Sequence, residues 1–144
     1  MGWCCCCLEP LKVLQRQALS IISFGDKRCS SLPLFVKFNC LKFDDIVELK
    51  SCSLSFKANL NLLPNHLQAH FNQNSSVHTY GTRQSKNYHI ESTQINIKQI
   101  STIFRSKKLW NSLGQNLKQC KNLTIFKKKF HQDKIESYKS ELCE

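Results

Sequence analysis

The sequence has few glycines and lacks every glycine-rich motif that supports catalysis. Four glycines are spread over 144 residues, and the patterns GxxxxGK[ST], GxSxG and GxGxxG are all absent. Loops of these kinds bring backbone amides close to a phosphate or expose a nucleophilic serine. We therefore assign no catalytic residue and expect no cofactor.

Long apolar runs are also missing. No stretch reaches the roughly 18 apolar residues that a membrane-spanning helix needs. The start shows no charged region followed by an apolar region and a cleavage site, so it does not resemble a secretory signal. We expect a single intracellular domain, nuclear or cytoplasmic and not secreted.

Cysteine is abundant, but its spacing does not suit a metal site. Four of the nine cysteines are adjacent at positions 4–7, and no CxxC pair occurs among the others. His66 and His70 share a helical spacing but have no evident third ligand, so we assign no metal. The adjacent cysteines suit palmitoylation. One interpretation is therefore a small basic helical interaction protein, associated with membranes through acylated N-terminal cysteines.

Acidic residues are scarce and unevenly distributed. Lysine and arginine number 21 against 10 aspartate and glutamate residues, which gives a net charge of +11. Between Glu91 and Asp133 there is no acidic residue, and we call this stretch the acid-free segment. Its basic residues are Lys98, Arg105, Lys107, Lys108, Lys118, Lys121, Lys127, Lys128 and Lys129. Two interpretations stay open: a surface for a phosphate backbone, or a solvated helix face.

Apolar spacing indicates a mainly helical chain. Apolar residues three and four positions apart predict a helix from Pro10 to Ile22, because this spacing draws one stripe along a helix. A second helix is predicted to begin at an N-cap, Asp44 or Asp45. A short helix is expected around Trp110. A final helix is expected to place apolar side chains on one face and lysines toward solvent.

The remaining segments complete the predicted fold class, which is mainly α with a small β-hairpin (α+β), an irregular helical accessory domain. The polar stretch 72–86 is predicted to be an exposed loop. β-branched and aromatic residues predict short strands around 87–105. We expect a disordered cysteine-rich start at 1–9, one helical domain at 10–131 and a frayed charged tail at 132–144.

Six segments in a fixed order resemble one protein family. They are LKVLQRQA (11–18) with Ile21-Ile22, PLFVKFNCLKFDDI (33–46), LLP (62–64), HTYGTR (78–83), IFR and LWNSL (within 103–113), and LTIFKKKF (123–130). Together they resemble the region C-terminal to the polymerase domain in reverse transcriptases of non-LTR, LINE-like and jockey-type retrotransposons. The resemblance runs from about Leu8 to His131.

The resemblance implies an accessory role for the chain. Family members combine an endonuclease with an RNA-directed DNA polymerase, and the matching segment would help to hold the RNA template or target DNA. The polymerase carboxylates, which bind two catalytic metal ions, belong to the upstream domain. The resemblance therefore implies RNA or DNA as a partner, together with the missing upstream polymerase domain of the same element, and no activity of this chain alone.

Candidate nucleic-acid contacts lie in the predicted loop and in the acid-free segment. The basic candidates are Arg83, Arg105, Lys107, Lys108, Lys127, Lys128 and Lys129. Tyr80 and Trp110 are candidates for stacking on bases. Each of two candidates also has an alternative role. Arg83 could instead fix the conformation of its own loop, and Trp110 could lie in the core between leucines. Asn111 is expected to bond to local backbone.

Overall fold

Helices account for most of the chain in the computed structural model, which describes residues 5–24, 30–77, 83–92 and 96–143. The described helices are α1 (Cys5–Ile22), α2 (Leu32–Lys37), α3 (Phe43–Asn59), α4 (Asn65–Gln68), α5 (Asn74–Val77), α6 (Asn96–Ile100), α7 (Thr102–Ser112), α8 (Gln115–Lys118) and α9 (Leu123–Cys143). The prediction of a mainly helical chain is confirmed. None of these helices is long and apolar enough to cross a membrane.

Two asparagines end helices α2 and α3. Asn39 and Asn61 have positive φ values of 52° and 54°, in the left-handed region that asparagine tolerates better than most residues. After α3, the N–H of Asn61 donates to Ala58 at 3.1 Å and the N–H of Leu62 donates to Lys57 at 2.9 Å. This pair of bonds is a Schellman motif, which satisfies the last carbonyls of the helix.

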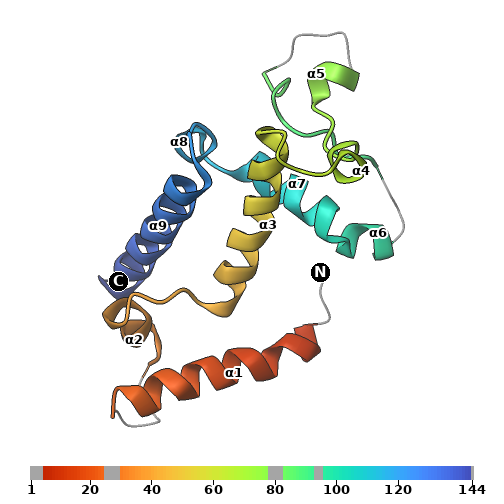
Figure 1. Cartoon of the computed structure of the whole chain (residues 1–144). Coiled ribbons are helices and arrows are strands. Elements are labelled where there is room, and N and C mark those ends of the chain that lie inside the picture. Colours follow the sequence, from red (N-terminus) through yellow and green to blue (C-terminus); the bar gives the residue numbers. More distant parts are fainter. Residues whose placement is uncertain (1–4, 25–29, 78–82, 93–95, 144) are drawn as a thin grey trace.

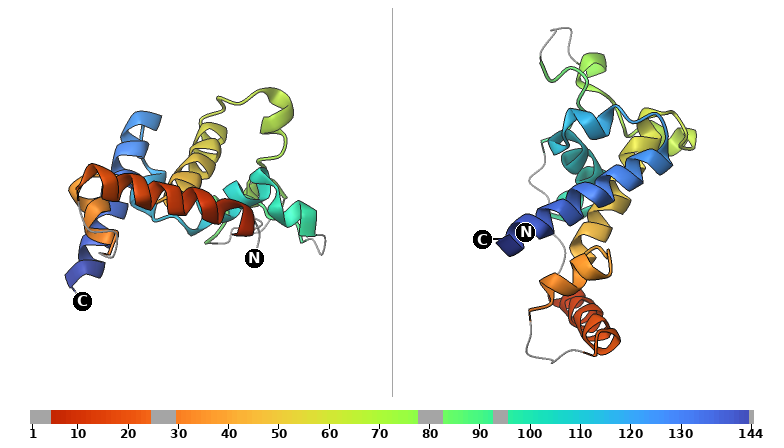
Figure 2. Two further views of the ribbon diagram at one scale, coloured as in Figure 1. Left: turned by 90° about the horizontal axis from the view of Figure 1, so that it is seen from below. Right: turned by 90° about the vertical axis from the view of Figure 1, so that its left-hand side faces the viewer.

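Helix α3 lies at the centre of the arrangement. Figure 1 shows α7 on one side of α3 and α9 on the other. Helix α2 contacts α9, and α1 crosses the lower end of the molecule, where it contacts α2 and α3. The view from below in Figure 2 shows α1 running across the ends of the other helices. Helix α3 therefore joins the two parts of the core.

The larger part of the core, which we call the main core, surrounds the second half of α3. Its buried members are Cys52, Phe56, Ala58, Phe71, Tyr88, Trp110, Leu117, Cys120, Phe126 and Phe130. A smaller tail core contains Leu19, Phe35, Leu41, Ile135 and Tyr138. Partly buried Leu49 on α3 packs against both groups. The burial of apolar surface stabilises this packing by about 25 cal/mol per Å2 and is the main force that holds the helices together.

The predicted strands around 87–105 are wrong for the described part of that segment, and residues 93–95 lie outside it. The described residues contain no sheet. One isolated antiparallel bridge, between Gln73 and Tyr88, is the nearest equivalent to the expected hairpin. From Asn96 onward the segment forms α6 and then α7. The hydroxyl of Ser101 accepts a hydrogen bond from the N–H of Phe104 at 3.3 Å and caps α7. Ile97 and Ile100 therefore lie in one helix and Ile103 in the next, and none of the three lies in a strand.

Both predicted disordered ends contain helix. Helix α1 begins at Cys5, so Pro10 lies inside the helix rather than at its start, and residues 1–4 lie outside the described part. Helix α9 continues to Cys143 instead of fraying after His131. Ile135 and Tyr138 are buried in the tail core, and this burial stabilises the last turns despite their charged composition.

The N-cap predicted for α3 is also wrong. Lys42 occupies the cap position, and its side chain makes no capping bond. Asp44 and Asp45 lie in the first turn, where their charge is favourable near the positive end of the helix dipole. The polar stretch 72–86 contains the short helix α5, and its residues 78–82 lie outside the described part.

The apolar stripe predicted on the first helix exists but faces solvent. Leu14 is 58% exposed, Ile21 is 69% exposed and Ile22 is 59% exposed. Leu19 is buried, at 7% exposed. Helix α1 therefore contacts the rest of the protein through one face and leaves its most apolar face uncovered within the described structure.

Candidate nucleic-acid interface

Stacked aromatic side chains fix the positions of α7 and α9 against α3. The rings of Phe56 and Phe126 stack with centroids 4.9 Å apart and an interplanar angle of 27°. The ring of Trp110 lies 6.1 Å from both of them, and Phe130 lies 6.2 Å from Phe126. Such pairs add about 0.5–1.5 kcal/mol each beyond their area burial. This packing sets the rotation of α9 about its axis.

The rotation of α9 places its lysines in solvent. Phe126 and Phe130 are 0% and 1% exposed, one helical turn apart. The residues between them, Lys127, Lys128 and Lys129, are all exposed, and we call them the lysine triplet. Successive helical residues are about 100° apart, so the triplet spans about 200° of the helix surface. The three ammonium groups therefore point in three different directions.

Several other cations of the acid-free segment are already engaged. Lys98 forms an ion pair with Glu91. The ammonium of Lys118 donates to the carbonyl oxygen of Asn111 at 3.1 Å and to Oδ1 of Asn87 at 3.4 Å. Burial lowers the pKa of Lys118. These two lysines serve the fold more directly than an external partner.

Five exposed lysines of the acid-free segment, unlike the exposed Lys98, have no ion-pair partner within the described residues. They are Lys108, Lys121, Lys127, Lys128 and Lys129, and we call them the exposed lysine set. None of the five forms an ion pair or a side-chain hydrogen bond within the described part of the chain. No acidic residue occurs in the sequence between Glu91 and Asp133 to neutralise them locally. A phosphate backbone would meet little competition at these positions.

The stacking role predicted for Trp110 is wrong. Its side chain is 3% exposed and packs among Phe56, Tyr88 and Phe126. The alternative of a core residue is the one that the structure supports. A ring enclosed by other rings offers no free face to a base.

The prediction that Lys107 contacts nucleic acid at the surface is also wrong. It is 8% exposed, and its ammonium lies 6.0 Å from the centroid of the Phe71 ring. Lys107 precedes Trp110 by three residues, which places both on the inner face of α7. Helical spacing from a core tryptophan was the sequence signal that could have separated Lys107 from Lys108.

The remaining candidates divide between exposed, half-buried and undescribed positions. Arg83 is exposed in a turn that is held by a 3.0 Å bond from Asn74 to the carbonyl of Gln84. Arg105 is half-buried on α7. Tyr80 lies outside the described residues. The structure therefore places the exposed lysine set and Arg83 at the surface and leaves Arg105 half-buried.

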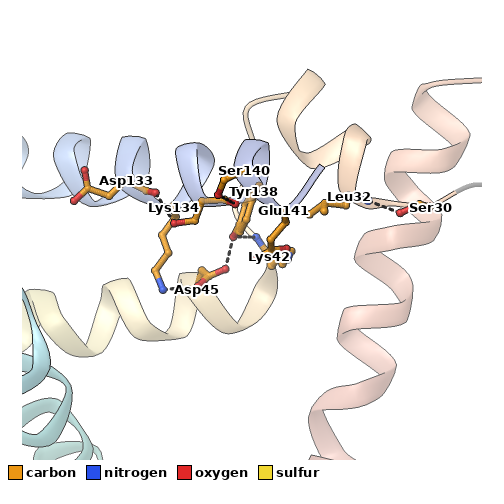
Figure 3. A network of polar contacts seen from close by, with 10 residues as sticks. Ser30, Leu32, Lys42, Asp45, Asp133, Lys134, Tyr138, Ser140 and Glu141 are labelled. Carbon is orange, nitrogen blue, oxygen red and sulfur yellow. Dashed lines mark hydrogen bonds and ion pairs between the residues drawn. The ribbon is translucent and has the colours of Figure 1, made fainter. Parts of the chain in front are cut away.

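A polar network attaches the second half of α9 to the start of α3 (Figure 3). The ammonium of Lys134 lies 2.8 Å from Oδ1 of Asp45 and 2.7 Å from Oε2 of Glu48. The hydroxyl of Tyr138 donates to Asp45 and accepts from the backbone N–H of Lys42 at 3.1 Å. The lysine triplet is therefore carried by a helix that is held at both of its ends.

The pKa values of two groups in this network are raised. Burial, reinforced by the hydrogen bond to Asp45, raises the pKa of Tyr138. Burial lowers the pKa of Lys134, but the hydrogen bonds to Asp45 and Glu48 outweigh it, so the net shift is upward. Both groups therefore hold their protons more tightly in the folded chain than in the unfolded chain.

Metal-binding clusters are absent from the described residues. No group of three or more histidine, cysteine, aspartate or glutamate side chains is close enough to hold an ion there. His66 on α4 and His70 just after it are both exposed. Two exposed imidazoles do not complete the ligand set of a zinc site.

Comparisons with known proteins identify no relative. No family model matches the chain, and no curated protein or solved structure matches it significantly.

Proposed function

We propose that the chain is the C-terminal accessory segment of a non-LTR retrotransposon reverse transcriptase, an RNA-directed DNA polymerase. In this proposal it binds single-stranded RNA or DNA through the exposed lysine set. The observation that carries the proposal is the set of five exposed lysines, which have no acidic partner within the described structure. Each lysine that neutralises a phosphate releases a condensed counterion and so favours binding.

The residues that carry the family resemblance have structural roles, which supports the proposal. Trp110 lies in the main core and Asn111 binds backbone in another segment. Phe35 belongs to the tail core. Residues of this kind are needed for folding even in a chain that performs no chemistry.

The directions of the lysine triplet favour a single strand over a duplex. A rigid duplex meets one face of a helix, whereas the triplet spans about 200°. A single strand bends around a helix more easily and can follow all three ammonium groups. The chain is expected to have no polymerase activity by itself. The neighbouring carboxylates Asp44 and Asp45 form ion pairs with Lys12 and Lys134, respectively, and so are not free to bind catalytic metal ions.

A salt titration tests this proposal. Binding of a labelled single-stranded RNA is measured by fluorescence anisotropy between about 50 and 200 mM salt, beside a duplex of the same sequence. Contacts to three to five phosphates predict a slope of about −2 to −3.5 for log affinity against log salt concentration. Weaker binding of the duplex is expected. An affinity that does not depend on salt contradicts the proposal.

A second candidate function rests on the uncovered face of α1. Leu11, Leu14, Ile21 and Ile22 are all at least 46% exposed and lie on one face. Contiguous exposed apolar residues mark binding surfaces. The alternative is therefore a small basic interaction protein that meets a partner through α1, with membrane association through acylated cysteines at 4–7. Mass spectrometry that finds those cysteines unmodified removes the acylated form.

A further inference from the structure

A small pocket lies where α7 and α6 approach the segment at Ile90 and Glu91. Its volume is about 300 Å3, at the lower end of the range found for small-molecule sites. Ile90, Ile103 and Phe104 form an apolar wall. Polar groups reach the same space from three different parts of the chain, and these groups give the pocket its chemical character.

Lys107 is the most deeply placed cation of this pocket. Its side chain is 8% exposed, and it is the one charged residue classed as buried among the described residues. It lines the pocket, and its ammonium makes no hydrogen bond or ion pair within the described part of the chain. The ring of Phe71, 6.0 Å away, only partly offsets the desolvation cost of this ammonium. A ligand that supplies negative charge would remove that cost.

The acid beside Lys107 is already occupied. Glu91 forms an ion pair with Lys98, and this bond lowers the pKa of Glu91. Burial lowers the pKa of Lys107, and Lys98 adds to that effect, while Glu91 opposes it. The pocket therefore holds two ammonium groups against one carboxylate, with His70 at its edge. Its net charge favours an anion.

We propose that this pocket binds the phosphate group of a nucleotide. The ammonium of Lys107 binds the phosphate oxygens, and the hydroxyl of Ser101 donates to them while it still accepts from the N–H of Phe104. The ring of Phe104 stacks on the base, because aromatic rings stack on bases of any sequence, and Ile90 and Ile103 pack against it. The inference rests on the proposed function for its ligand class, a nucleotide unit, but a free mononucleotide tests it separately.

The first experiment titrates the full chain with three small probes, followed by heteronuclear NMR. The probes are adenosine 5′-monophosphate, inorganic phosphate and adenosine. We expect the nucleotide to bind most tightly, phosphate to bind more weakly and adenosine to give no saturable shift. Shifts are expected at Lys107 and Ser101. Equal binding of adenosine and its monophosphate overturns the proposal, as does the absence of binding by the monophosphate.

The second experiment uses charge variants with matched controls. Lys107→Met keeps the apolar stem beside Phe71 and removes the ammonium, and it should weaken nucleotide binding about tenfold or more. Lys139→Met removes an exposed ammonium on α9 outside the pocket lining and should leave the dissociation constant within about twofold. Glu91→Gln should tighten binding about threefold to tenfold, because it removes a repulsive charge. An unchanged affinity in Lys107→Met, with the melting temperature preserved, overturns the proposal.

Variants of the lysine triplet and of Lys107 distinguish the pocket from the surface that is proposed to bind RNA. Binding of single-stranded RNA depends on the exposed lysine set, whereas binding of the mononucleotide depends on Lys107. Loss of RNA binding in a variant with Lys127→Gln, Lys128→Gln and Lys129→Gln, with mononucleotide binding retained, supports both assignments. A wild-type chain that binds RNA but no mononucleotide overturns the pocket alone. A chain that binds the mononucleotide but no RNA overturns the proposed function alone.

Discussion

The side-chain amide of Asn111 forms two hydrogen bonds with the backbone of Tyr88. It donates to the carbonyl oxygen at 2.8 Å and accepts from the N–H at 2.9 Å. The amide therefore occupies the place that a neighbouring strand would take. The hydroxyl of Tyr88 also donates to the carbonyl of Ser55 at 2.9 Å. These bonds hold the segment at 83–92 against both α7 and α3.

Removal of the Asn111 amide should destabilise the chain. Asn111→Ala leaves both backbone groups of Tyr88 without their partners in a partly buried site, and we expect a loss of about 2–3 kcal/mol in unfolding free energy. Urea denaturation measures this loss. Asn116→Ala, at an exposed position of α8, is the control and should change stability by less than about 0.5 kcal/mol. Equal stability of the two variants would show that the two bonds contribute little.

Trp110 should matter for stability and not for nucleic-acid binding. Trp110→Phe removes part of a buried ring and should cost about 1–3 kcal/mol in unfolding free energy. Its dissociation constant for single-stranded RNA should stay within about twofold of the wild-type value, because the indole ring is enclosed by other side chains. A large loss of RNA affinity in a folded Trp110→Phe chain would restore the stacking interpretation.

The last turns of α9 should be protected from hydrogen exchange. Tyr138→Phe removes the bond to Asp45 and the acceptor for the N–H of Lys42, and we expect a loss of about 1–3 kcal/mol locally. Exchange measured by mass spectrometry should accelerate in peptides covering 135–143 and change little in α7. Ser137→Ala, at an exposed position, is the control. Rapid exchange of 135–143 in the wild type would support a frayed tail.

Alkaline pH should destabilise the fold through the thiol of Cys52. Burial raises the pKa of this thiol from 9.0 to about 12, with a smaller contribution from Glu48. The folded chain holds the proton more tightly, so the associated stability is present below pH 9 and is lost as pH rises toward 12. The burial-raised pKa of Tyr88 acts in the same direction.

The contribution of Cys52 can be isolated by substitution. Cys52→Ala should make the fall in unfolding free energy between pH 9 and 11 shallower by up to about 1.4 kcal/mol per pH unit. Denaturation is measured with a reductant present. Cys143→Ala, at an exposed position, should keep the wild-type slope. An identical pH dependence in both variants would contradict the burial of the Cys52 thiol.

The sequence predicts the helices better than their ends. Local spacing of apolar residues identifies α3 and α9. In α9, for example, Phe126 and Phe130 are about one helical turn apart. Local spacing does not identify the tail beyond His131, since the burial of Ile135 depends on contacts with Phe35 and Leu41, about 100 residues away in sequence. The strands around 87–105 are mispredicted because the preference of β-branched residues for strands depends strongly on context. The N-cap at Ser101 stabilises a helix there instead.

The candidate surface is only partly predictable. Absence of acidic residues between Glu91 and Asp133 identifies the basic segment, and the positions of Lys127 to Lys129 between core phenylalanines identify their exposure. The spacing of three residues between Lys107 and the core residue Trp110 indicates the burial of Lys107. The pairing of Lys98 with Glu91 joins two separate segments, and no local pattern reports it. The role of Asn111 is a further example: its partner is 23 residues away in sequence.

The most direct test of the central claim compares two triple variants with the same change in charge. One replaces the lysine triplet (Lys127→Gln, Lys128→Gln, Lys129→Gln). The other replaces three exposed lysines outside the acid-free segment (Lys37→Gln, Lys50→Gln, Lys57→Gln). The measurement is the salt dependence of single-stranded RNA binding. We predict that the first variant loses about 2 units of slope while the second keeps the wild-type slope. Equal slopes in the two variants would show that overall charge, and not the start of α9, governs binding.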